Sequence, residues 1–144
     1  MIYTEQTKKA LKICFDAHKE QLDKSGLPYV FHPFHLAEQM KDESCTVVAL
    51  LHDVAEDTPI TLDELRAAGF GDEIIDALKL LTHAPDVPYM DYIRAIKTNP
   101  IARAVKLADL SHNGDMSRLS PEEIDDWALA RAEKYKAATE LLLS

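Results

Sequence analysis

Residues 47–58, VVALLHDVAEDT, carry the strongest structural signal in the chain. The first five positions are too apolar for a helix that faces water, and four titratable side chains follow closely after them. Asp53, Glu56 and Asp57 stand at i, i+3 and i+4, a spacing that puts three carboxylates on one face of a helix. The stretch therefore predicts a buried helix with a cluster of charge at its C-terminal end.

Such a cluster of acids needs a cation. Carboxylates on one helix face repel one another, and taking each charge out of water costs on the order of several kcal/mol. A divalent metal is the simplest candidate, with His52 and Asp53 as direct ligands. The alternative is an exposed helix end at which the acids are solvated.

Helical periodicity runs through nearly the whole chain, and alternating β-branched residues are almost absent. Thr61 and Ser120 each begin a capping box, and Asn99 precedes a proline that suits the first position of a helix. The expected helices cover about residues 4–23, 32–40, 44–58, 61–69, 72–81, 88–97 and 100–117, with a last helix that starts at residues 120–121. Because only short joints separate them, the sequence predicts one all-α domain, a bundle of about eight helices over residues 1–144.

Composition argues against several classes of function. The formal net charge is −9, with 25 acidic residues against 16 basic ones, so we do not expect a nucleic-acid-binding protein. No apolar run approaches the ~18 residues needed to cross a bilayer, and the N-terminus lacks signal-peptide character. The four glycines do not have the spacing of a P-loop or a dinucleotide-binding loop. Cys14 and Cys45 fit reduced core thiols, so we expect a cytoplasmic protein.

Two further segments place polar side chains where a packed helix is expected. Lys106, Asp109 and Asn113 stand at i, i+3 and i+7 of a segment whose other positions are largely apolar. Asp109 is a candidate metal ligand and Asn113 a candidate substrate contact, whereas the alternative is an amphipathic helix with this stripe in solvent. His32 lies between apolar neighbours, and it is either a further ligand or an ordinary buried or capping histidine.

His32, the adjacent pair His52-Asp53, and Asp109 form an H…HD…D pattern, and in this the chain resembles the HD-domain metal-dependent phosphohydrolases. The chain further resembles the hydrolase domain of the RelA/SpoT enzymes and the stand-alone small alarmone hydrolases. Four stretches carry this resemblance: AHKEQLDKSGLPYVFHPFHLAE, ALLHDVAEDT, TLDEL with GFGDEI, and NPIARAVKLADLSHN, at residues 17–38, 49–58, 61–74 and 99–113. It extends from about residue 17 to residue 135, and it implies an all-α HD-domain fold and the hydrolysis of a phosphorylated nucleotide.

The resemblance also implies roles for individual residues. One divalent metal ion, usually manganese in this family, would be held by His32, His52, Asp53 and Asp109. The water that attacks the substrate would be oriented and activated by Glu56 and Asp57. The nucleotide would be contacted by Lys24, Ser25, Asn113, Arg131 and Tyr135. Taken without the family, Arg131 and Tyr135 fit a surface arginine stacked on a tyrosine.

The chemistry of the donor set agrees with these roles. Two imidazoles and two carboxylates differ from the thiolate-rich set of a structural zinc site, and they suit manganese, iron, cobalt or magnesium with open water positions. Because the protein is acidic, a polyanionic substrate needs a local basic wall, for which Lys24, Lys106 and Arg131 are candidates. Lys106 is equally suited to balancing the charge of Asp109.

Three positions depart from the family pattern: Asp23, His35 and Leu110. Asp23 stands where an arginine that stacks on guanine usually precedes the lysine, and a carboxylate neither stacks in that way nor attracts phosphate. We expect removal of the 3′-pyrophosphate from guanosine 3′,5′-bis(diphosphate), ppGpp, or from pppGpp, to give GDP or GTP and pyrophosphate. The alternatives are the same chemistry on another phosphorylated nucleotide, and a non-catalytic module that binds a metal or a nucleotide. Trp127 and the apolar residues 141–143 are expected to pack, either within the domain or in a homo-oligomer.

Overall fold

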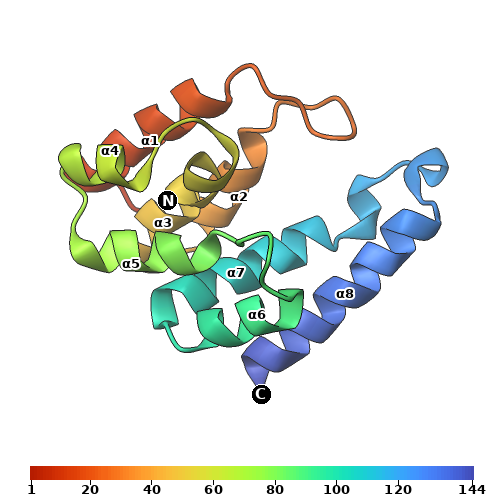
Figure 1. Ribbon diagram of the computed structural model, residues 1–144. Coiled ribbons are helices and arrows are strands. Elements are labelled where there is room, and N and C mark those ends of the chain that lie inside the picture. The colour runs from red at the N-terminus through yellow and green to blue at the C-terminus, as the bar shows by residue number, and fades with distance from the viewer.

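Eight α-helices and two short 3-10 helices make up the fold of the computed structural model, which describes all 144 residues (Figure 1). The α-helices are α1 (Glu5–His18), α2 (Phe31–Glu38), α3 (Glu43–Asp57), α4 (Leu62–Ala67), α5 (Asp72–Leu81), α6 (Tyr89–Lys97), α7 (Pro100–Asn113) and α8 (Asp126–Leu143). The 3-10 helices are η1 (Met116–Arg118) and η2 (Pro121–Glu123). Extended pairing is limited to one isolated bridge between Leu22 and Pro28. The predicted all-α bundle of about eight helices is therefore confirmed.

Helix α3 runs through the middle of the molecule. Its ten consecutive residues Cys45–Val54 are all buried, so the helix is covered on every side, as the apolar run predicts. Asp42 caps the N-terminus of α3 by accepting the backbone N–H of Cys45 at 2.7 Å. The helix ends at Asp57, because Pro59 disfavours helical geometry in the residue before it.

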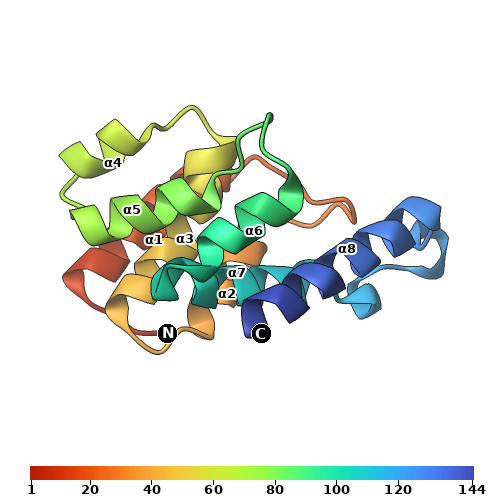
Figure 2. The same ribbon diagram turned by 60° about the horizontal axis from the view of Figure 1, so that its bottom comes forward.

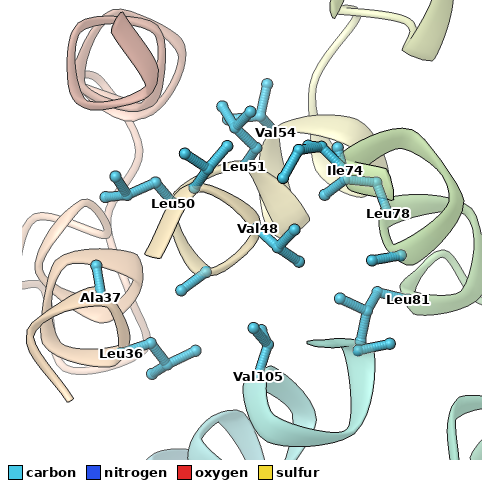
Figure 3. Close-up of a cluster of buried hydrophobic side chains, with 14 of the residues drawn as sticks. Leu36, Ala37, Val48, Leu50, Leu51, Val54, Ile74, Leu78, Leu81 and Val105 are labelled. Carbon is cyan, nitrogen blue, oxygen red and sulfur yellow. The ribbon is translucent and has the colours of Figure 1, made fainter. Parts of the chain in front are cut away.

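The other helices pack around α3 and form the core. Leu36 and Ala37 of α2, Leu78 and Leu81 of α5, and Val105 of α7 surround it in Figure 3, and all five are buried. Helix α1 covers a further side of α3, and α6 and α8 pack against α7 as an outer layer (Figure 2). This packing fixes the C-terminal end of α3 relative to α2 and α7, the two helices that carry the other predicted metal ligands.

The first helix is shorter than the sequence predicts. The pattern indicates a helix to about residue 23, but α1 ends at His18. The chain then turns back, with the backbone N–H of Asp23 donating to the carbonyl of Leu27 at 2.8 Å. Gly26 adopts a φ of 80°, which a residue with a Cβ rarely takes, and closes the turn. These local hydrogen bonds compete with the helix and end it early.

The segment between α7 and α8 also differs from the prediction. A helix to about residue 117 is expected, but α7 ends at Asn113, and Asp115 caps η1 instead. The capping box at Ser120 is present, yet it begins η2 rather than the last helix. Helix α8 starts only after Asp125, whose side chain accepts the backbone N–H of Ala128 at 2.8 Å. Short polar side chains cap the backbone at three successive places here. The chain therefore forms η1, η2 and α8 in turn, where the sequence predicts the end of one long helix and the start of the next.

The cysteines lie where the sequence predicts, whereas the apolar C-terminal residues pack only in part. Cys14 and Cys45 are free and buried, and burial raises the pKa of each thiol to about 12. Leu142 is fully buried against the core, whereas the neighbouring Leu143 is exposed. None of the helices combines the length and the apolar character that a membrane span requires.

Replacing Leu50 by alanine tests the central position of α3. Leu50 is fully buried, so Leu50→Ala should lower the free energy of unfolding by about 2–5 kcal/mol. Leu129→Ala, at an exposed position of α8, should change that free energy by no more than about 0.5 kcal/mol. Urea denaturation of both variants measures the difference, and equal stability of the two variants would contradict the packing.

Candidate metal centre and substrate cavity

Three helices bring two histidines and two aspartates to one place. His32 comes from α2, His52 and Asp53 from α3, and Asp109 from α7, and all four side chains are buried. Nε2 of His32 lies 2.9 Å from Oδ1 of Asp109 and 3.7 Å from Oδ2 of Asp53. Nε2 of His52 lies 3.2 Å from Oδ1 of Asp53 and 3.7 Å from Oδ1 of Asp109. Two imidazole nitrogens and two carboxylates therefore converge on one small volume.

One ring nitrogen of His52 has no hydrogen-bond partner. Its Nδ1 lies 2.7 Å from the carbonyl oxygen of Ala49 and donates to it, because a carbonyl oxygen only accepts. In the neutral ring, Nε2 is then the nitrogen with the lone pair, and it is buried and unpartnered. It faces the carboxylates of Asp53 and Asp109, which also only accept. A cation is what would satisfy acceptors that meet in this way, so the residues present fit a divalent metal.

The charges in this cluster point the same way. Burial opposes a positive charge on His52, but the carboxylates of Asp53 and Asp109 outweigh it and raise the pKa of His52 to about 9. Burial would also raise the pKa of Asp109, but the ammonium group of Lys106 and then the two imidazoles hold that pKa well below its usual range. The cluster thus keeps a buried carboxylate ionised and, without a metal, holds a proton on His52, whose place a divalent metal would take.

Neighbouring side chains hold the ligand candidates in place. Nδ1 of His32 lies 2.7 Å from Nδ1 of His112, and the two rings are stacked with their centroids 4.9 Å apart. The hydroxyl of Tyr29 donates to Oδ2 of Asp53 at 2.5 Å. Such contacts fix the orientation of a metal ligand before the metal arrives.

The polar stripe of α7 faces inward, so the solvent-facing alternative is wrong. Nζ of Lys106 donates to Oδ2 of Asp109 at 2.9 Å, and the lysine side chain is only 13% exposed. Nδ2 of Asn113 donates to Oδ1 of the same aspartate at 3.0 Å. Lys106 therefore balances the charge of Asp109, as one of its two expected roles requires.

Glu56 and Asp57 border an inner cavity of about 240 Å³ beside this cluster, together with Asp53. Carboxylate oxygens of the three acids lie within 4.8 Å of one another. Oε2 of Glu56 accepts the backbone N–H of His83 at 2.8 Å. Partial burial raises the pKa of Glu56 and of Asp57, and the neighbouring carboxylates add to both shifts. Both acids remain exposed, so the alternative of solvated acids describes these two, whereas Asp53 is buried.

Residues of the loop that follows α1 and of the start of α8 line an outer cavity of about 420 Å³. Both segments lie at the right of Figure 1. All five predicted substrate contacts line this cavity: Lys24, Ser25, Asn113, Arg131 and Tyr135. Tyr29, Asn113 and Tyr135 also line the inner cavity, so the two cavities adjoin at these side chains. Of these two cavities, only the outer one reaches the volume of a typical small-molecule site. The structure thus brings these residues together, while their contact with substrate stays a prediction.

Contacts across the outer cavity join the loop after α1 to the start of α8. Nζ of Lys24 lies 3.1 Å from the ring centroid of Trp127, and the guanidinium carbon of Arg131 lies 4.3 Å from it. The hydroxyl of Ser25 donates to Oε2 of Glu123 at 2.8 Å. The expectation that Trp127 packs in the domain is wrong, because its side chain is 57% exposed. The groups that contact its ring are cations rather than apolar side chains.

Sequence reasoning missed two contributions to the site. Tyr29 stands three residues before His32, and this proximity is the one signal that points to it. The contact of His83 with Glu56 runs through the backbone, so no residue type reveals it.

Comparisons with known proteins identify the family. Human MESH1, named a guanosine-3′,5′-bis(diphosphate) 3′-pyrophosphohydrolase, is 33% identical over 132 residues, which are 82% of this chain and 72% of that protein. A probable GTP pyrophosphokinase of Mycobacterium leprae is 34% identical over 80% of this chain, and the bifunctional (p)ppGpp synthase/hydrolase SpoT of Escherichia coli is 30% identical over 76%. The matches span only 16% and 18% of the lengths of these two bacterial proteins. No family model matches the chain.

A solved structure shares the fold. The structure of a metazoan SpoT orthologue, described as hydrolysing ppGpp, superimposes with a TM-score of 0.76 over 99% of this chain and 88% of that one, at 21% identity. Fold and site together define an all-helical HD-type hydrolase domain. The chain belongs to the family of guanosine-3′,5′-bis(diphosphate) 3′-pyrophosphohydrolases that includes human MESH1. The resemblance found in the sequence is confirmed.

Removing Asp53 tests the metal centre. Asp53→Ala deletes one of four donors and should abolish tight binding of a single Mn²⁺ ion, measured by calorimetric titration of chelator-treated protein with the metal alone. The wild-type protein should bind the ion and unfold at a higher temperature in its presence.

The matched control is Asp91→Ala, because that carboxylate pairs with Arg94 on the exposed surface of α6. It should bind the metal as the wild type does. Wild-type affinity in the Asp53→Ala variant would show that Asp53 is not a ligand.

Proposed function

We propose that this protein is a metal-dependent hydrolase that removes the 3′-pyrophosphate from ppGpp and pppGpp. The observation that carries the proposal is the convergence of four buried ligand candidates beside an acid pair and two adjoining cavities. A module that only binds a metal or nucleotide has no need of Glu56 and Asp57 at this position. The relatives named as 3′-pyrophosphohydrolases point to the same reaction.

His32, His52, Asp53 and Asp109 would hold one divalent metal ion. Manganese is our first choice, because two imidazoles and two carboxylates without thiolates suit a metal that accepts both nitrogen and oxygen ligands. A metal held by these residues would supply Lewis-acid chemistry, which would lower the pKa of the attacking water and neutralise charge on a phosphoryl oxygen.

Glu56 is the acid best placed to take a proton from the attacking water. The backbone N–H of His83 holds its carboxylate in position, and its raised pKa brings it closer to the range in which a base works near neutral pH. Asp57 lies beside it on the same helix end and would orient the water. The oxygen of this water bonds to phosphorus, the bond from phosphorus to the ribose 3′ oxygen breaks, and that oxygen ends as a hydroxyl.

Lys24 and Arg131 supply positive charge to a nucleotide in the outer cavity. The chain as a whole is strongly acidic, so these local cations offset the repulsion that a polyanion would meet elsewhere. We therefore propose a small nucleotide rather than a nucleic acid as the partner of this site. The free, buried thiols of Cys14 and Cys45 support the expected cytoplasmic location.

Pyrophosphate release from ppGpp, measured with added Mn²⁺ and with a chelator, tests this function. The wild-type protein should release pyrophosphate only with the metal. Glu56→Gln keeps the size of the side chain and removes its charge, so it should retain the metal and lose turnover by about 100-fold or more.

Glu140→Gln, at an exposed position in the second half of α8, is the matched control and should turn over normally. Absence of release by metal-loaded wild-type protein would exclude ppGpp as the substrate and favour another phosphorylated nucleotide. Undiminished turnover by Glu56→Gln would remove Glu56 from the mechanism.

A further inference from the structure

The outer cavity contains a carboxylate and a guanidinium that the reaction above does not use. Asp23 lies in the loop after α1, and Arg118 lies at the end of η1. Both line the part of the outer cavity that is not shared with the inner one, together with Leu22, Leu27 and Leu119. Glu56 and Asp57 do not line this part of the site, because they border only the inner cavity.

The carboxylate of Asp23 accepts hydrogen bonds at one oxygen only, and its other oxygen is within ion-pair distance of Arg118. Oδ1 accepts the backbone N–H groups of Ser25 and Leu27, each at 2.9 Å, so the loop itself fixes the orientation of the side chain. Oδ2 accepts no hydrogen bond, and Nη2 of Arg118 lies 3.8 Å from it. An oriented acceptor with unused capacity thus stands at the cavity wall.

Arg118 places hydrogen-bond donors beside this acceptor. Its Nη1 donates to the carbonyl oxygen of His112 at 2.8 Å, which anchors the guanidinium at the end of α7. The side chain is 32% exposed and that of Asp23 is 21% exposed, so a ligand in the cavity can reach both. A guanidinium carries five N–H donors, and the bond to His112 uses only one of them.

The hydrogen-bonding edge of guanine matches this pair. Guanine presents an acceptor, O6, next to two donor groups, N1–H and the 2-amino group, whereas adenine has neither O6 nor these donors at the same positions. Leu22, Leu27 and Leu119 supply the apolar surface that the flat faces of a base require. The negative charge of Asp23 also repels phosphate, which favours a nucleotide whose phosphates point away from it, toward the inner cavity.

We propose that Asp23 and Arg118 form the nucleobase subsite and select guanine. Oδ2 of Asp23 accepts from N1–H and the 2-amino group, and Arg118 donates to O6. The proposal rests on the proposed function, since it assigns the base half of the same substrate. Asp23, which replaces the base-stacking arginine expected from the family, then recognises the edge of the base instead of its face.

Asp23→Asn tests the subsite with the smallest change in shape. The asparagine oxygen still accepts the N–H groups of Ser25 and Leu27, but an amide that donates replaces the free Oδ2 and opposes the donors of guanine. KM for ppGpp should rise about tenfold or more, while KM for the adenosine counterpart should change less than about twofold. The effect should appear in KM rather than in kcat, because the base lies remote from the reacting phosphorus.

Asp42→Asn is the matched control, because Asp42 also accepts a backbone N–H, at the N-terminus of α3, away from both cavities that form the site. It should leave the preference for guanosine over adenosine unchanged. Arg118→Gln should raise KM for ppGpp as Asp23→Asn does. An unchanged ratio of the two KM values in Asp23→Asn would overturn the proposal.

Calorimetric binding of GDP and ADP separates this proposal from the proposed function, because binding needs no turnover. The wild-type protein should bind GDP more tightly than ADP, and Asp23→Asn should lose at least about tenfold of that preference. Preference for GDP without hydrolysis of ppGpp would refute the proposed reaction and support the base subsite. Hydrolysis of ppGpp with no effect of Asp23→Asn on binding would support the reaction and refute the subsite.

Discussion

The buried Nε2 of His52 has no hydrogen-bond partner and faces the carboxylates of Asp53 and Asp109, and this arrangement is the physical constraint on which the site depends. Hydrogen-bond acceptors that face one another in a buried site are unfavourable unless a cation binds between them. The bond from Nδ1 of His52 to Ala49 commits the ring to this orientation, so the requirement for a cation is built into α3 itself. An acidic protein can in this way create a strongly local site for a metal and, next to it, for a polyanion.

The packing of the core holds the residues of this site in position. Helix α3 is buried over ten residues, which is unusual for a helix that ends in three carboxylates, and its burial fixes the acids relative to α2 and α7. The loop after α1 and the segment before α8 are held instead by polar contacts such as Ser25 with Glu123. The buried part of the molecule thus carries the metal ligand candidates, and segments joined by polar contacts surround the outer cavity.

Local signals made much of the fold predictable. Residues 72–81 form α5 with the expected bounds, and Thr61 caps α4 through the expected box with Glu64, because both features depend on neighbouring residues. The early end of α1 and the division of the segment before α8 were not predictable, because several short polar side chains compete for the same backbone groups. The four ligand candidates were identifiable because their motif has characteristic residue types. The contact of Tyr29 with Asp53 and the exposure of Trp127 depend on tertiary packing, so the sequence did not indicate them.

Anomalous scattering from a crystal soaked in Mn²⁺, recorded at the manganese absorption edge, tests the central claim most directly. The account predicts one strong peak within coordination distance of His32, His52, Asp53 and Asp109, about 2.0–2.3 Å from their nitrogen and oxygen atoms. A peak bound only by Glu56 and Asp57, or no peak at all between α2, α3 and α7, would contradict it.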